Sequence, residues 1–173
     1  RMELIALMGR TAAFSFAAGV NLCATVAVIG LASRLNWVDL PQQFHLFDSD
    51  LVIGAAIVLY LLEFLADKVP YVDTVWDLVH TAIRPVGGAF VAVASIGDAS
   101  PAAQGLAALF GGTLAAGSHL TKAGTRVMAN TTPEPLSNWA LSFVEDGFVV
   151  GLGVLALIYP VAALVVTAVL AGL

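Results

Sequence analysis

The residues best suited to chemistry are charged side chains gathered in one stretch of an otherwise apolar chain. The segment EFLADKVPYVDTVWDLVHTAIRP, residues 63–85, carries Asp73, Asp77, His80 and Arg84 at spacings of four, three and four. On an α-helix these spacings place all four side chains on one face. Carboxylates beside a histidine and an arginine can bind a cation, exchange a proton or hold an anionic group.

Comparable polar stripes recur in other apolar segments. Glu63 and Asp67 are four residues apart, and His119, Lys122 and Arg126 are spaced by three and four. Lipid cannot satisfy such stripes, so they are expected to face one another, with acids on the second, third and fifth elements meeting bases on the third and fourth. The predicted polar or transport centre comprises Glu63, Asp67, Asp73, Asp77, His80, Arg84, His119, Lys122, Arg126, Asn138, Glu145 and Asp146.

The same residues admit simpler roles. Asp67, Lys122 and Arg126, together with Lys68, could mark the cytoplasmic interface, because basic residues accumulate there. Asp73 could cap the start of a helix. For the deeper residues the alternative is a structural salt-bridge network that only locks helices together.

A metal site is a weaker hypothesis. Asp77, His80, His119 and Glu145 offer oxygen and nitrogen ligands, but their spacing matches no specific zinc signature. The chain has no G-x-S-x-G, P-loop or G-x-G-x-x-G motif, so no catalytic residue is assigned and an enzyme is not favoured. Paired carboxylates with a histidine could still act on a lipid head group. A bound cation or a lipid is the cofactor class that this pattern allows.

Composition places the stripes in a membrane protein. The 173 residues are 60% hydrophobic and 11% charged, against about 25% charged in soluble domains. Three stretches, residues 11–33, 99–121 and 147–173, contain no Asp, Glu, Lys or Arg, and each exceeds the roughly 20 residues that a spanning helix needs. The net charge of −5 argues against a nucleic-acid partner. Cys23 is the only cysteine, which excludes an intrachain disulfide.

We predict an all-α, polytopic transmembrane bundle in a single domain, residues 1–173. The bundle is predicted to have five to six elements. The sequence does not decide whether the short fifth element crosses the membrane. Pro85 lies inside the third element and Pro160 inside the sixth. The predicted elements are Thr11–Arg34, Leu51–Lys68, Thr74–Gly97, Ala102–Val127, Ser137–Asp146 and Phe148–Gly172.

Orientation is predicted from the basic residues near the helix ends. A cytoplasmic N-terminus puts five of them on the inside and leaves Arg34 outside with the acidic loop of residues 35–50. The five are Arg1, Arg10, Lys68, Lys122 and Arg126.

A weak internal repeat divides the chain into halves 1–98 and 99–173. Residues 19–34 align without gaps to 111–126, residues 62–67 to 141–146, and residues 85–94 to 160–169. With three crossings in each half, the second half would be inverted, a plan that in transporters puts the binding site at the repeat interface.

Two long blocks carry a family resemblance. LEFLADKVPYVDTVWDLVHTAIRP and HLTKAGTRVMANTTPEPLSNWALSFVEDG, together with NLCATVAVIGLASRL, resemble the bacterial membrane family called domain of unknown function 4126, over most of the chain. The resemblance implies a small multi-helix protein of the bacterial inner membrane and transfers no catalytic role.

The leading hypothesis is a transporter- or channel-like protein for an ion or small polar solute. Asp77 and Glu145 would bind a cation or proton, Arg84 would offset acid charge, and His80 and His119 would line the path with them. The first alternative is a structural or assembly subunit of a membrane complex, and the second is a lipid-acting enzyme. Besides the bilayer, expected partners are a second copy in a homodimer or a larger complex, since so small a bundle encloses little room.

Overall fold

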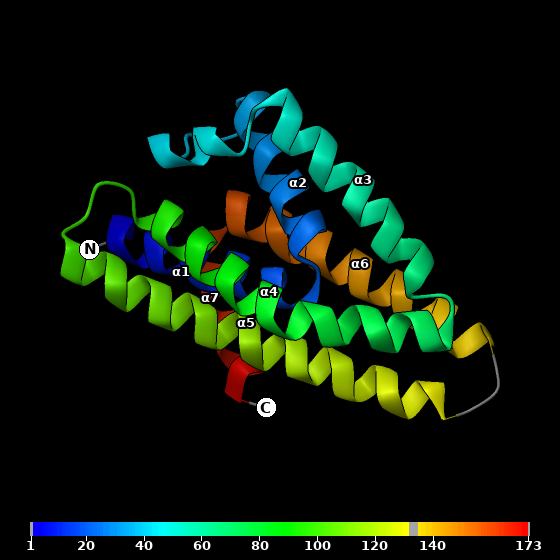
Figure 1. Cartoon of the computed structure of the whole chain (residues 1–173). Coiled ribbons are helices and arrows are strands. Elements are labelled where there is room, and N and C mark those ends of the chain that lie inside the picture. The colour runs from blue at the N-terminus through cyan, green and yellow to red at the C-terminus, as the bar shows by residue number, and fades with distance from the viewer. Residues whose placement is uncertain (1, 132–134, 173) are drawn as a thin grey trace.

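A computed structural model describes residues 2–131 and 135–172, and it confirms the all-α prediction. The described chain forms seven α-helices and one short 3-10 helix, η1, joined by turns and one longer loop, with no strand in these two ranges (Figure 1). The elements are α1 (Met2–Val20), α2 (Leu22–Arg34), η1 (Gln42–Leu46), α3 (Asp50–Ala66), α4 (Pro70–Ile96), α5 (Pro101–Asn130), α6 (Pro135–Ile158) and α7 (Pro160–Gly172).

The prediction of one helix over Thr11–Arg34 is wrong, because the chain breaks at Asn21. Asn21 has an extended backbone (φ −149°, ψ 101°), and its side-chain oxygen accepts a hydrogen bond from the Ala24 N–H at 2.9 Å. The asparagine therefore caps α2 and lets it leave in a new direction. Arg10 Nη1 donates to the Asp39 carbonyl at 3.4 Å, so α2 returns the chain toward the first half of α1.

The predicted boundary between Ser137–Asp146 and Phe148–Gly172 is also misplaced. Helix α6 runs through Gly147 to Ile158, and the break comes at Tyr159. Pro160 explains the break, since it lacks an N–H and disfavours helical geometry in the residue before it. Residues 137–146 are thus the first part of a long helix rather than a short separate element.

Helices α4 and α5 pack closely as an antiparallel pair, and glycines set their separation. A Cβ on Gly88 would lie 2.9 Å from the Gly111 carbonyl oxygen, and one on Gly111 would lie 2.7 Å from the Gly88 oxygen. Helix α1 lies against both, since Ser15 Oγ donates to the Gly88 carbonyl of α4 at 3.3 Å and Gly19 meets α5. Such close approach is typical of helices that associate in lipid through small residues.

The bundle has two distinct ends. At one end lie the start of α1 and the loop after α2, where Gln43 bonds Asp98 in the α4–α5 turn at 2.7 Å. At the other end meet the end of α3, the start of α4, the end of α5 and the start of α6 (Figure 1). Arg10 and Lys68 therefore lie toward opposite ends of the bundle, and the orientation with a cytoplasmic N-terminus stays a prediction. Arg1, the first of the basic residues behind that prediction, lies outside the described residues.

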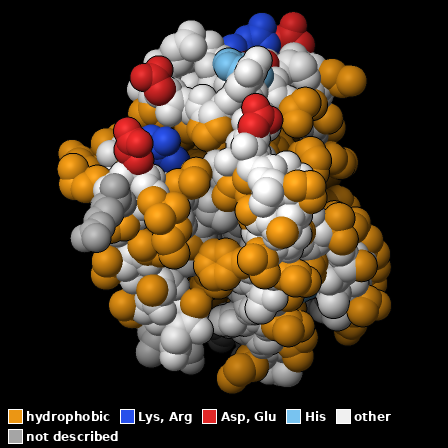
Figure 2. Space-filling model, turned by 90° about the vertical axis from the view of Figure 1, so that its left-hand side faces the viewer, with side chains coloured by type: hydrophobic (Ala, Val, Ile, Leu, Met, Phe, Trp, Pro, Cys, Tyr) orange, Lys and Arg blue, Asp and Glu red, His pale blue; other side chains and the backbone are white. Residues whose placement is uncertain are grey.

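Polar and apolar side chains are distributed as expected for a bundle in lipid. Arg84 and Arg126 are the largest fully buried side chains, whereas Leu61, Leu78 and Leu109 are among many large exposed apolar ones. Figure 2 shows apolar side chains over most of one face, with charged ones gathered in its upper part. Three helices are long and apolar enough to cross a membrane: Met2–Val20, Tyr71–Ile96 and Leu136–Ile158. Together these features indicate a membrane protein.

The inverted repeat stays a prediction. Residues 19–34 contain the break at Asn21, whereas the aligned residues 111–126 lie inside the unbroken α5. The two aligned segments thus differ in local structure, and the division into halves 1–98 and 99–173 also stays a prediction.

Candidate functional site

The predicted acids and bases meet inside the bundle, as their spacing predicted. Acids come from α3, α4 and α6 and bases from α4 and α5, and all of these side chains are nearly or fully buried. We call this set the charge network: Glu63, Asp67, Asp77, Arg84, Lys122, Arg126 and Glu145. Asp67, Lys122 and Arg126 are buried between the helices, and their assignment to the cytoplasmic interface stays a prediction.

Arg84 joins α4 to α3 at the deepest point of the network. Its Nη2 lies 2.6 Å from Glu63 Oε1, and its Nη1 lies 3.3 Å from Asp77 Oδ1 and 3.4 Å from the Gly19 carbonyl oxygen. The Arg84 and Glu63 side chains have no exposed surface. Removing either partner would leave a buried charge without compensation.

Lys122 and Arg126, one turn apart on α5, bind the remaining acids. Lys122 Nζ lies 3.2 Å from Glu63, 3.4 Å from Asp67 and 3.6 Å from Glu145. Arg126 Nη2 lies 3.0 Å from Asp67 Oδ2 and 2.6 Å from Glu145 Oε2, while Nε contacts both Glu145 oxygens. The two bases thus tie α3 and α6 to α5.

Hydrogen bonds fix His119 as a neutral imidazole. Arg84 Nη1 can only donate, so His119 Nδ1, at 2.7 Å, must accept. Nε2 then carries the proton and donates to Thr81 Oγ1 at 3.0 Å, and the Thr81 hydroxyl donates to the Asp77 carbonyl at 3.0 Å. With both nitrogens engaged, His119 contributes no charge to the network.

The network therefore contains more negative than positive charge. Within the seven residues of the network as defined, four carboxylates against three cations leave an excess of one negative charge. One oxygen each of Glu63, Asp67 and Asp77 is buried and has no hydrogen-bond partner among these residues. An uncompensated charge in such a place costs several kcal/mol, so a proton or a cation is expected to balance it.

Asp77 is the least compensated of the four acids. Glu63, Asp67 and Glu145 each have two cationic partners, whereas Asp77 has only Arg84. Asp77 also lines a cavity of about 220 Å³ between α4 and α5. Its side chain is 7% exposed and its Oδ2 is the oxygen without a partner.

The other predicted residues surround the network in smaller groups. Asp73 is not a helix cap, since α4 begins at Pro70 and the Asp73 carboxylate accepts from Asn130 at 2.8 Å. Asn138 bonds Asn130 through its side chain at 2.8 Å and contacts Arg126 through its carbonyl. Asp146 accepts hydrogen bonds from Asn21 at 3.3 Å and from Tyr60 at 3.1 Å.

The metal ligands proposed from sequence do not converge. His80 stacks on Trp76 and donates to its carbonyl at 2.8 Å, while His119 is engaged at both ring nitrogens. Asp77 and Glu145 pair with different bases, Arg84 and Arg126. Within residues 2–131 and 135–172, no group of three or more His, Cys, Asp or Glu side chains is arranged to hold a metal ion.

Sequence reasoning missed several polar partners. Tyr60 precedes Glu63 by three residues and so belongs to the same helical face, a signal that was available. Asn21 is an amide in a long apolar run, but the predicted helix Thr11–Arg34 passes through it without a break. Thr81 and Asn130 carried no signal, because hydroxyl and amide residues are common on helices.

Comparisons with known proteins give one match. The family described as "Domain of unknown function (DUF4126)" matches residues 8–173, nearly the whole chain. No curated protein and no solved structure matches.

Proposed function

The chain belongs to the family of domain of unknown function 4126, and because that description names no activity, we propose a function from the charge network alone. The proposal is a multi-pass protein of a bacterial inner membrane that transports an ion or small polar solute and exchanges a proton at Asp77. It develops the expectation that intramembrane ionisable groups serve function.

The observation that carries the proposal is the single excess negative charge beside an open cavity. The charged or titratable groups around Asp77 include Glu63 on α3 and Asp67 just after it, Asp73 and Arg84 on α4, and His119, Lys122 and Arg126 on α5. Every base among them has at least one other acidic partner. A proton on Asp77 would neutralise the network, and the cavity of about 220 Å³ would let it arrive and leave.

Proton exchange would also change how the helices are held together. Asp77 and Glu63 share Arg84, so protonating Asp77 leaves that guanidinium to Glu63. The α3–α4 contact then strengthens relative to the contact within α4. A shift of this kind between two arrangements is what coupled transport requires.

The rival is the structural network, and one observation favours it. Each base is paired with at least two carboxylates, and Arg126 contacts both oxygens of Glu145, as in a rigid lock. If the network is only a lock, protonation of Asp77 serves no purpose and Asp77→Asn changes stability alone.

Vesicles that contain the purified protein and a trapped pH dye distinguish proton exchange at Asp77 from a purely structural network. An imposed inward proton gradient should acidify wild-type vesicles faster than empty ones, and Asp77→Asn should abolish the difference. Asp98→Asn, in the α4–α5 turn, is the matched control and should behave as wild type. Equal rates for wild type, Asp77→Asn and empty vesicles would contradict the proposal.

A further inference from the structure

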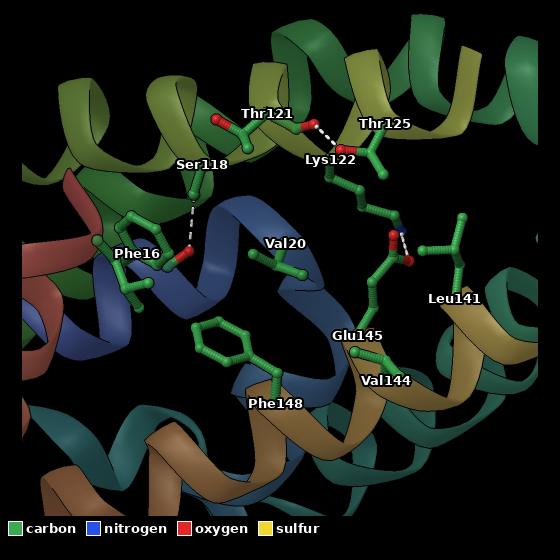
Figure 3. Close-up of a pocket in the computed structure, with 11 residues that line it drawn as sticks. Phe16, Val20, Ser118, Thr121, Lys122, Thr125, Leu141, Val144, Glu145 and Phe148 are labelled. Carbon is green, nitrogen blue, oxygen red and sulfur yellow. Dashed lines mark hydrogen bonds and ion pairs between the residues drawn. The ribbon is translucent and has the colours of Figure 1, made fainter. Parts of the chain in front are cut away.

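A second cavity reaches the charge network from the side of the bundle. It has a volume of about 470 Å³, within the usual range of small-molecule sites, and lies among α1, α5, α6 and α7. Figure 3 shows Lys122 and Glu145 extending toward each other at one end, with Phe16, Val20 and Phe148 at the other. The cavity is therefore amphiphilic, with an ion pair at one end and an apolar wall.

The polar groups of this cavity are arranged to accept hydrogen bonds. The hydroxyl protons of Ser118, Thr121 and Thr125 are used on backbone carbonyls at 2.7, 3.0 and 2.9 Å. Lys122 lies close to three carboxylates, which compensate its charge. What remains for a ligand is the oxygen lone pairs of the hydroxyls and of Glu145. A ligand that fits must bring N–H or O–H donors.

The lining contains one base and one acid, Lys122 and Glu145, so the preference for a cation comes from the network behind them. Glu145 has the most exposed side chain of the network, at 13%, and the network behind it has one excess negative charge. Phe16 and Phe148, in edge contact at 6.2 Å, add aromatic faces that attract cations. An anionic head group would meet acceptors and excess negative charge instead.

The surroundings of the cavity select an apolar body for the ligand. Val144, which lines the cavity, is 67% exposed, and its neighbour on α6, Phe143, is exposed as well. In a membrane this surface contacts acyl chains, so a ligand reaches the cavity from the bilayer. We propose that the α5–α6 cavity binds an amphiphilic organic cation, a protonated amine on a hydrocarbon or aromatic body, with the ammonium at Glu145.

This inference rests on the proposed function, since it names a cargo class that could replace the proton as the compensating charge. Binding of the amine at Glu145 would supply the positive charge that the network lacks. Release of the proton from Asp77 would then keep the network neutral, which couples the two cavities through Arg126, Lys122 and Arg84.

The test is thermal unfolding of the full chain in a non-ionic detergent, titrated with octylamine, octanol or octanoate. We expect octylamine to raise the unfolding temperature saturably, octanol to do so at about tenfold higher concentration or more, and octanoate to have no specific effect. Glu145→Gln should weaken the octylamine response by about tenfold, and Asp98→Asn should leave it unchanged.

A second variant covers the case in which Glu145→Gln does not fold. Phe148→Trp keeps an apolar aromatic side chain but reduces the cavity, and it should weaken octylamine binding without weakening the charge network. Equal responses to all three probes, or wild-type octylamine binding in either variant, would overturn the inference. Octylamine binding without vesicle acidification would support this site and contradict the proposed proton exchange. Vesicle acidification without octylamine binding would support the proton exchange and contradict this site.

Discussion

Helices α4 and α5 pass through two regions that are held together by different forces. In one half of the bundle, Gly88 of α4 and Gly111 of α5 bring the backbones into contact. In the other half, Arg84 of α4 and Lys122 of α5 reach the same carboxylate, that of Glu63. The change from glycine contact to ion pairs takes about one turn on α4, between Gly88 and Arg84, and about three turns on α5, between Gly111 and Lys122.

The difference shows what can hold helices together in lipid. Lipid is as apolar as a leucine side chain, so burial of apolar surface gives little drive for helices to associate there. The glycine half relies on close van der Waals packing, which has one geometry and no titratable group. The charged half relies on ion pairs that can exchange partners. We therefore assign chemistry to the charged half and rigidity to the glycine half.

The largest expected effect comes from breaking the charged half at its centre. Arg84→Met leaves Glu63 and Asp77 without their shared partner, and loss of one member of a buried pair costs about 3–5 kcal/mol. Arg34→Met removes an exposed pair with Asp50 and should cost no more than about 1 kcal/mol. Unfolding in mixed detergent measures the free energy of unfolding of both variants. Similar losses of this free energy for Arg84→Met and Arg34→Met would mean that burial does not make an ion pair more important.

The next effect comes from breaking the glycine half. Gly111→Ala places a methyl group 2.7 Å from the Gly88 oxygen and in conflict with Ala92, so overpacking should cost about 1–3 kcal/mol. Gly117→Ala on the same helix meets nothing within 4 Å and should be neutral or stabilising, because alanine favours helix. Thermal unfolding of Gly111→Ala and Gly117→Ala compares the two sites. Equal unfolding temperatures for the two variants would contradict close packing at Gly111.

A smaller effect should come from the helix break where the two halves meet. Asn21→Ala removes the cap of α2, worth about 1 kcal/mol, and the hydrogen bond to Asp146. Ser100→Ala removes a comparable cap from α5, but no contact with the network. Denaturation should therefore show a greater loss of unfolding free energy for Asn21→Ala than for Ser100→Ala. A smaller loss than for Ser100→Ala would show that Asp146 does not depend on Asn21.

The smallest effect concerns an exposed pair outside the bilayer. The hydrogen bond from His45 Nδ1, at 2.6 Å, lowers the pKa of Asp48 below its usual value of about 3.9. Its contribution to stability is therefore complete above about pH 4 and is lost as the pH falls through the lowered pKa. Measured from pH 6 downward, the free energy of unfolding should fall slightly less steeply for Asp48→Asn than for wild type. A steeper fall in the variant would contradict a lowered pKa of Asp48.

The stripes were predictable from sequence because helical spacing fixes which side chains share a face. Asp77, Arg84, Lys122 and Glu145 were expected to meet for that reason, and the structure brings them together. The pairing of individual partners was not predictable, since it depends on helix rotation and depth. No sequence signal indicated that Lys122 would lie nearest Glu63.

The helix breaks show the same limit. Asn21 is a good N-cap residue, but an asparagine inside an apolar run does not by itself predict a break. Its cap on Ala24 and its contact with Asp146 together fix the turn there. Pro160 is visible in the sequence, but the prediction places it inside the element Phe148–Gly172 rather than at a helix boundary. Because α1 and α2 form a bent pair instead of the single predicted helix, the side on which the chain continues after Arg34 does not follow from the length of the apolar run alone.

The central claim is that Asp77 holds the proton that compensates the excess charge of the network. Infrared spectroscopy of the purified protein, recorded while the pH is stepped, detects a protonated carboxyl group directly. We predict a buried carboxylic acid signal at neutral pH that disappears in Asp77→Asn and persists in Asp98→Asn. A spectrum without such a signal, or one that Asp77→Asn leaves unchanged, would contradict the claim.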